Sequence, residues 1–279
     1  MFTKKLAVVG LIGLLSLSGY VLATQAETNS TDKQDTLNEF NREQALEYSQ
    51  AVIDRQISNA HFTNSQGKPT QLAQYRGKPL VISMIYTSCF HICPTTTREL
   101  GHVVKKARDS LGDDSFQVVT IGFDTANDTA DAMRIFAKNQ AVRYKNWDFL
   151  ASDQATIDKL SKDLGFLYFP SPHGFDHLVQ STIIDAEGKV YRQVYGMHIS
   201  TPHFVEPLKE LVFGTPKDNS LFSKISNKIR LFCTVYDPAN DRYRFDYSMF
   251  AGLISSLLVG GLFLFWLAKE WRKYRRQQL

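Results

Sequence analysis

The sequence predicts an α/β domain with a mixed central sheet and flanking helices, and three observations support that fold class. Apolar, β-branched runs such as Val81 to Ile85 and Phe116 to Phe123 have the composition of buried strands. Amphipathic helical segments separate them, as parallel strands require. The last two strands, Ser181 to Asp185 and Val190 to Tyr195, are joined by a turn too short for anything except an antiparallel hairpin.

The first elements precede the main sheet. Residues 27–57 read as a polar tether followed by a helix from Arg42 to Gln56. His61, Phe62 and Thr63, with turn residues up to Pro69, predict a short hairpin at the start of a domain that spans residues 58–213.

The strand at Val81 leads into two cysteines and then Pro94, which predicts a helix beginning there and ending at Gly112. After the second strand, Asp124 and Asp128 are interpreted as a helix-capping loop, and Ser152 as the cap of a later helix. The other predicted elements are a helix with Ala130 and Phe136, a strand at Trp147 to Leu150, a helix to Leu164, a loop at Pro170 to Gly174 and a helix over His203 to Val212. Three βα units followed by a hairpin and a helix are thioredoxin-like architecture.

The N-terminus resembles a secretory signal. Lys4 and Lys5 precede an apolar run from Leu6 to Ala23, and small residues end it near Ala26. Residues 1–26 are therefore predicted to be a signal peptide, with an uncleaved N-terminal anchor as the alternative.

The C-terminal part carries a second apolar run. Residues 249–268 are free of charge and long enough for a transmembrane helix, and the basic residues of 269–279 indicate a cytoplasmic tail. The domain is then expected on the periplasmic side of a bacterial inner membrane, where thiols form disulfides or hold metals. Residues 214–248 are predicted to be a juxtamembrane link that carries Cys233.

Composition limits the partners. The formal net charge is only +4, and part of that excess lies in the C-terminal tail, so the sequence indicates no nucleic-acid-binding face. It leaves the oligomeric state open. Three cysteines allow one close pair, Cys89 with Cys93, and Cys233 is left as a packed thiol, a link between chains or a relay for metal.

Cys89 and Cys93 are four residues apart at a helix start, where the positive end of the helix dipole favours thiolates. The spacing permits either a shared metal ion or a disulfide. Two thiolates leave a metal undercoordinated, and His177, just before the strand that starts at Val179, is the histidine best placed to supply a third ligand. Asp176 could orient its imidazole or tune it as a ligand. The alternative is an ordinary loop histidine.

Three segments, YTSCFHICP, GFDTANDT and FDHLVQSTIIDAEGKV, resemble the SCO/SenC family of membrane-tethered copper proteins with a thioredoxin fold. The resemblance covers about Phe62 to Leu211. It implies that Cys89, Cys93 and His177 bind one copper ion, as Cu(I) or Cu(II). It also implies a role in assembling the copper centre of cytochrome c oxidase, by delivering copper to a subunit of the oxidase or by reducing its thiols.

The sequence also departs from the family. Phe90 and His91 occupy the loop in which many members have a proline, and the predicted C-terminal span differs from the usual N-terminal anchor. His91 is a possible fourth ligand or an exposed loop residue. The rival hypotheses are a thiol-disulfide oxidoreductase in which Cys89 attacks and Cys93 resolves, and a peroxidase that depends on Cys89. Thioredoxin-like reductases carry a cis-proline where this chain has Val179, which argues against a general reductase.

Overall fold

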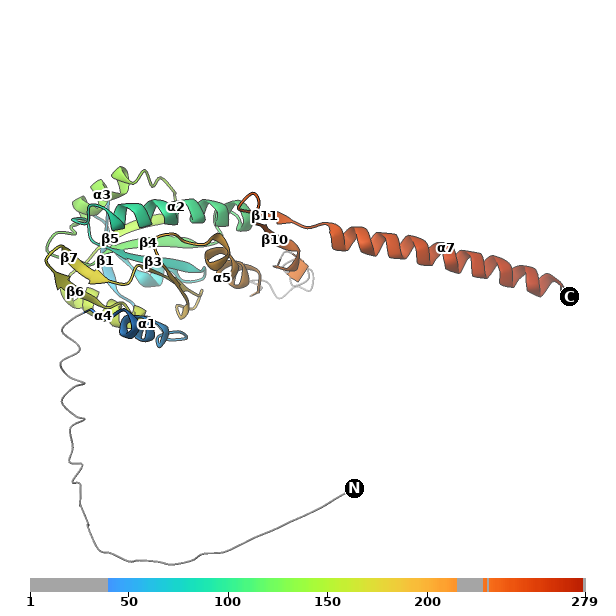
Figure 1. Ribbon diagram of the computed structural model, residues 1–279, viewed down its shortest axis with the longest axis horizontal. Coiled ribbons are helices and arrows are strands. Elements are labelled where there is room, and N and C mark those ends of the chain that lie inside the picture. Colours follow the sequence, from blue (N-terminus) through green and yellow to red (C-terminus); the bar gives the residue numbers. More distant parts are fainter. Residues whose placement is uncertain (1–39, 215–227, 230, 278–279) are drawn as a thin grey trace, which may run out of the picture. The chain divides into compact units, whose positions relative to one another are not determined.

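A computed structural model describes residues 40–214, 228–229 and 231–277 of the chain. The predicted signal or anchor at residues 1–26 and most of the predicted tether lie outside the described residues, and both stay predictions. The described residues form a folded domain, a hairpin that follows it and a long C-terminal helix (Figure 1).

A seven-stranded mixed sheet organises the domain, in the order β2-β1-β5-β4-β3-β8-β9. The central strands β3, β4 and β5 are parallel, and all the other pairings are antiparallel. The strands are β1 (His61–Asn64), β2 (Pro69–Gln71), β3 (Leu80–Ile85), β4 (Gln117–Gly122), β5 (Trp147–Ala151), β8 (Gln180–Ile184) and β9 (Val190–Tyr195).

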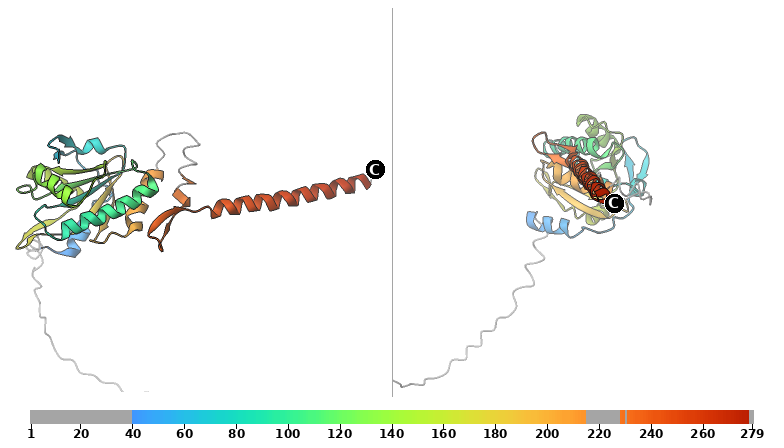
Figure 2. Two further views of the ribbon diagram at one scale, coloured as in Figure 1. Left: turned by 90° about the horizontal axis from the view of Figure 1, so that it is seen from above. Right: turned by 90° about the vertical axis from the view of Figure 1, so that its right-hand side faces the viewer.

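Helices cover both faces of the sheet. In Figure 1, α2 and α3 lie above the sheet while α1 and α4 lie below it, and Figure 2 shows α2 running along its face. The fifth helix, α5, packs against α2 and β9. Their bounds are α1 (Arg42–Gln50), α2 (Ile92–Leu111), α3 (Ala130–Asn139), α4 (Gln154–Leu164) and α5 (Thr201–Gly214).

The core lies between these layers. All six residues of β3 are buried, because this strand is central and covered on both faces. Phe116, Phe204 and Leu160 are among the largest side chains that are fully buried. The indole of Trp147 donates to Thr120 Oγ1 over 2.9 Å, so this buried polar group is satisfied. The mixed α/β class and the thioredoxin-like fold are confirmed.

Several predicted details differ. The first helix ends at Gln50 instead of continuing to Gln56. Asp153, not Ser152, caps α4, and it accepts from Thr156 N, because the Ser152 hydroxyl is used to donate to His61 O. The predicted loop around Pro170 is a hairpin of β6 (Tyr168–Ser171) and β7 (Gly174–His177).

The predicted link also contains a hairpin, formed by β10 (Thr234–Asp237) and β11 (Arg242–Phe245). It is attached to the domain by two lysines. Lys209 on α5 donates to Thr234 O over 2.9 Å, and Lys106 on α2 pairs with Asp241. Sequence patterning missed this hairpin because its strands are short and largely polar.

The last helix, α7 (Ser248–Gln277), contains the predicted span. Within it, the candidate span Phe250–Lys273 contains an 18-residue window with a mean hydropathy of 2.1, and none of that window is buried. By length and composition it is the one helix among the described residues that could cross a membrane.

Candidate metal and thiol site

The two cysteines lie where the buried strand β3 passes into α2. After Ile85 the chain turns, and Cys89 N donates to Tyr86 O over 3.2 Å. The helix then begins at Ile92, so Cys93 and Pro94 are its second and third residues. A proline is tolerated there because the first N–H groups of a helix have no partner within it.

Cys89 acts as a sulfur cap on this helix. The cap position itself is His91, whose side chain makes no capping hydrogen bond. Instead, Cys93 N donates to Cys89 Sγ over 3.2 Å, which satisfies one of the unpaired N–H groups of the first turn. The Cys89 sulfur is the acceptor in this contact, and the positive end of the helix dipole favours a negative charge on it.

The pKa values of the two thiols are shifted in opposite directions. Hydrogen bonding from the Cys93 thiol is the main cause that lowers the pKa of Cys89 from 9.0 to about 5, and the backbone N–H of Cys93 and the Tyr86 hydroxyl add to it. The same hydrogen bond, together with burial, raises the pKa of Cys93 far above its usual value. The pair therefore consists of a thiolate and a buried thiol that donates to it.

The Tyr86 hydroxyl is a further hydrogen-bond donor to the Cys89 thiolate. Burial and the hydrogen bond to Cys89 raise the pKa of the Tyr86 hydroxyl to about 12, so it stays a donor. Its position depends on Gly174, which has φ +121°; a Cβ there would lie 2.7 Å from the Tyr86 oxygen. Glycine is needed at 174 for both reasons.

His177 ends β7 and packs among aromatic rings. Its ring lies edge-on to Tyr86 and to Phe123, with centroids 6.2 and 5.4 Å away. Its Nδ1 lies 2.8 Å from the carbonyl oxygen of Leu178, so Nδ1 carries the proton and Nε2 keeps a free lone pair. Burial lowers the pKa of His177, which favours this neutral form. Leu178, not the exposed Asp176, orients the imidazole, whereas the predicted tuning by Asp176 remains as a charge that acts to raise the pKa of His177 against the larger effect of burial.

The predicted ligands are neighbours but do not form a closed metal site. Cys93 and His177 line one narrow cavity of about 10 Å³, and the charge of Cys89 acts on the imidazole. Among the residues that the structure describes, no three His, Cys, Asp or Glu side chains are gathered tightly enough to hold a metal. The donor types suit copper, because thiolates and imidazole are its preferred ligands.

Asp128 is a supporting residue whose role the sequence did not reveal. It is buried, and its carboxylate accepts from Thr87 N and Thr87 Oγ1, both over 2.7 Å, and from Asp124 N over 2.9 Å. It therefore braces the loop that carries Cys89. The capping interpretation is wrong, since Thr129 caps α3. Gly122 leaves room for this brace, because a Cβ there would lie 2.5 Å from Asp128 Cβ.

The remaining candidates are the side chains of Phe90, His91 and His173, which are exposed, and Cys233. Phe90 is 95% exposed, and His91 and His173 are exposed as well. Cys233 is a buried free thiol, 4% exposed, which agrees with the packed-cysteine alternative.

Comparison with known proteins adds an independent line of evidence. The SCO1/SenC family matches residues 54–212, which is 159 of 279 residues and more than half of the chain. The SCO1 protein homolog of Bacillus subtilis (strain 168) is 26% identical over 155 residues, covering 54% of this chain and 79% of its own.

Solved structures agree with this assignment. A SCO1/SenC family lipoprotein from Bacillus anthracis str. Ames is 25% identical with a TM-score of 0.52, covering 57% of this chain and 95% of its own. BsSco, described as a member of the Sco family of cytochrome c oxidase assembly proteins, shares the fold with a TM-score of 0.52 at 21% identity, covering 57% and 94%. The chain belongs to the SCO1/SenC family.

Proposed function

We propose that this protein is a membrane-tethered copper carrier that binds one copper ion through Cys89, Cys93 and His177. In this proposal it delivers copper to a respiratory oxidase copper site or reduces the thiols of that site. The observation that carries the proposal is the donor set itself, in which a Cys89 thiolate and an unprotonated His177 Nε2 belong to residues that both contact Tyr86. Two thiolates favour Cu(I), and the imidazole makes Cu(II) acceptable.

The acceptor and the location are proposed from the relatives and from α7. The Sco family is described through BsSco as assembling cytochrome c oxidase, so an oxidase subunit is the proposed acceptor. If α7 spans the membrane, the basic residues at its end favour a cytoplasmic C-terminus and a periplasmic domain. A cysteine-labelling assay with a membrane-impermeant reagent, on intact cells with cysteines introduced before and after α7, tests this orientation.

The copper proposal is tested on the reduced, detergent-solubilised full chain by competition with a Cu(I) chelator. The wild type is expected to bind one copper ion. His177→Ala is expected to weaken binding at least tenfold, since it removes one of three ligands. His173→Ala is the matched control, because His173 lies exposed at the tip of the same hairpin. A wild type that binds no Cu(I), or equal losses in both variants, would overturn the proposal.

The second candidate is a thiol-disulfide oxidoreductase, and the opposite acidities of the two thiols favour it. The Cys89 thiolate would attack a partner disulfide and release one partner sulfur as a thiolate. Cys93 would then lose its proton, attack the Cys89 sulfur and free the second partner thiol, leaving a Cys89–Cys93 disulfide. Metal-free turnover of a small disulfide with added thiol reductant, abolished in Cys89→Ser, would favour this alternative.

A further inference from the structure

One edge of the sheet is only partly covered. Strand β9 is the last strand of the sheet, so one side of its backbone has no neighbouring strand. Gly196 N donates to Val179 O over 2.9 Å, and backbone groups alternate along an antiparallel pair. Val194 therefore faces β8, whereas the N–H and C=O groups of Gln193 and Tyr195 face outward.

The chain already pairs with the start of this edge. Val190 accepts from Asp54 N over 2.8 Å and donates to Arg55 O over 2.9 Å, in the pattern of an added strand. This pairing stops before Gln193. Within residues 40–214 and the other described segments, no hydrogen bond reaches the outward backbone groups of Gln193 or Tyr195.

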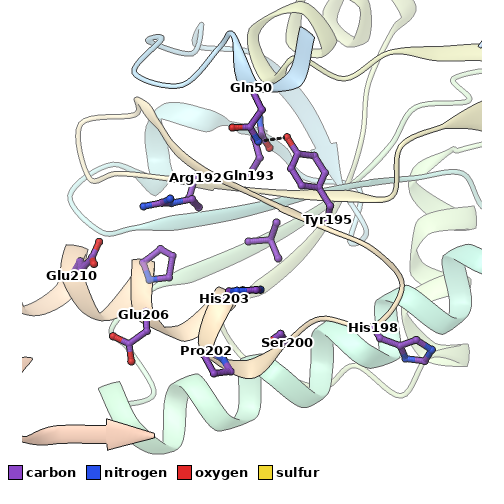
Figure 3. Close-up of a pocket in the computed structure, with 12 residues that line it drawn as sticks. Gln50, Arg192, Gln193, Tyr195, His198, Ser200, Pro202, His203, Glu206 and Glu210 are labelled. Atoms are coloured by element: carbon purple, nitrogen blue, oxygen red, sulfur yellow. Dashed lines mark hydrogen bonds between the residues drawn. The ribbon is translucent and has the colours of Figure 1, made fainter. Parts of the chain in front are cut away.

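A groove follows the open part of the edge. A cavity of about 620 Å³ lies between Gln50 of α1 and the first turns of α5, and Figure 3 shows the residues of β9 running between them. Its floor is fixed, because the Tyr195 hydroxyl contacts Ser49 Oγ and Gln50 Nε2 at 2.6 Å each. The buried Gln193 side chain donates to Leu164 O over 2.9 Å.

The groove continues to the proposed copper site. A second cavity of about 500 Å³ shares Tyr195 with the first and extends past Gly196 and Met197 to His177. Its walls include apolar side chains that are partly open to solvent: Leu46 is 41%, Ile92 41% and Met197 39% exposed. Because Tyr195 lines both, the two cavities adjoin: one follows the free strand edge and the other reaches the imidazole.

The charges along this path favour one kind of occupant. Charges of both signs line the first cavity: Arg192 with Glu206, which pairs with Lys209 at 3.0 Å, and Glu210, which keeps its charge while it accepts from the Tyr191 hydroxyl. Arg42 lines the second cavity, whose lining contains no carboxylate, and no salt bridge joins Arg42 to a described carboxylate. An apolar segment with an acidic residue near Arg42 matches the second cavity.

We propose that an extended segment of the copper acceptor binds here as an added strand on β9 and brings its metal ligands to His177. Backbone pairing at Gln193 and Tyr195 supplies affinity, and the apolar stretch at Met197 and Ile92 supplies specificity. This inference rests on the proposed copper-carrier function, and it goes beyond it by placing the acceptor on a particular edge of the sheet.

The test uses the full chain loaded with copper and the purified copper-site domain of a cytochrome c oxidase subunit as acceptor. Met197→Asp replaces an apolar wall residue by a carboxylate in the cavity that Arg42 lines, where it repels an acidic segment, and it is expected to slow copper transfer at least tenfold. Ile135→Asp is the matched control, because Ile135 is an exposed apolar residue on α3, outside the groove. Tyr195→Pro removes an outward N–H without breaking the ladder to β8, and it is expected to slow transfer similarly. Tyr195→Phe, which loses only the hydroxyl that contacts Ser49 and Gln50, is its control and is expected to keep the transfer rate.

Hydrogen exchange provides the direct readout. The amides of Gln193 and Tyr195 are expected to gain at least tenfold protection when the acceptor is added. Copper affinity is measured first on each variant without acceptor, so that failure of the copper site is distinguished from failure of the groove. Unchanged transfer in both groove variants at full copper loading would overturn the proposal, as would protection of these amides by dimerisation of the chain without acceptor.

Discussion

The titration of Cys89 is the most direct test of the site geometry. With a pKa of about 5, Cys89 is expected to be about 99% thiolate at pH 7, whereas a cysteine with the usual value is only a few per cent thiolate. Since the Cys93 thiol is the main cause of this shift, Cys93→Ala should raise the Cys89 midpoint. A hydrogen bond to a charged group contributes about 1.5–3 kcal/mol, which corresponds to about 1–2 pH units.

The assay is alkylation of the reduced full chain by iodoacetamide between pH 4 and 10, with each cysteine quantified by peptide mass spectrometry. The wild-type midpoint for Cys89 is expected near pH 5, and that of Cys93→Ala near pH 6–7, because Cys93 N–H still donates to the sulfur. Cys233 is the internal control; it is buried and should react slowly at every pH.

A comparison variant separates the two side-chain donors. Tyr86→Phe removes the Tyr86 hydroxyl, a smaller cause of the shift, and it should raise the midpoint less than Cys93→Ala does. The reasoning is refuted if wild-type Cys89 titrates between pH 8 and 9, or if Cys93 is alkylated at lower pH than Cys89.

Three further predictions concern the fold that supports the site. Asp128→Ala leaves three partly buried donors of Thr87 and Asp124 without their acceptor, so urea unfolding should show a loss of about 2–4 kcal/mol in the free energy of unfolding; a loss below about 1 kcal/mol would contradict the brace. Gly165→Ala should lower the free energy of unfolding by about 2 kcal/mol or more, because Gly165 has φ +62° and an added Cβ would lie 2.8 Å from Ser49 Cα. Gly101→Ala is its control: an added Cβ at this position on α2 meets open space, so the free energy of unfolding should stay the same or rise by about 0.5–1 kcal/mol. Lys209→Met should speed hydrogen exchange of β10 at least tenfold, since Lys209 holds Thr234 O and lies 5.7 Å from the Tyr243 ring centre. Lys105→Met, which breaks only an exposed pair with Asp109, should leave that exchange unchanged.

Sequence patterning predicted the parts of the fold that follow from hydrophobic periodicity. β3, β4, β5 and α2 were predictable because buried runs and a 3.6-residue repeat are local signals. The placement of Cys89 and Cys93 at a helix start was predictable because Pro94 is also a local signal, since proline is favoured in the first turn of a helix. The membrane-length apolar run was readable from composition alone.

Other features depend on contacts between distant segments, and no local pattern reports them. Asp128 looks like a capping residue until Thr87, 41 positions earlier, is known to lie against it. Tyr86 reads as the end of a strand, and only the packing of Gly174 against its hydroxyl shows how the donor is held near Cys89. The β6-β7 hairpin was hidden because Pro170 and Pro172 suggest a loop.

The length of α2 separates the cysteine site from the hairpin of β10 and β11. Cys93 lies at its beginning, and Lys106, which pairs with Asp241 of the second hairpin, lies 13 residues later. At 1.5 Å per residue the two positions are about 20 Å apart along the helix, roughly twice the Debye length at physiological ionic strength. Charges on the hairpin are therefore screened from the thiolate. Evolution could exchange the anchoring segment for another without retuning the acidity of Cys89.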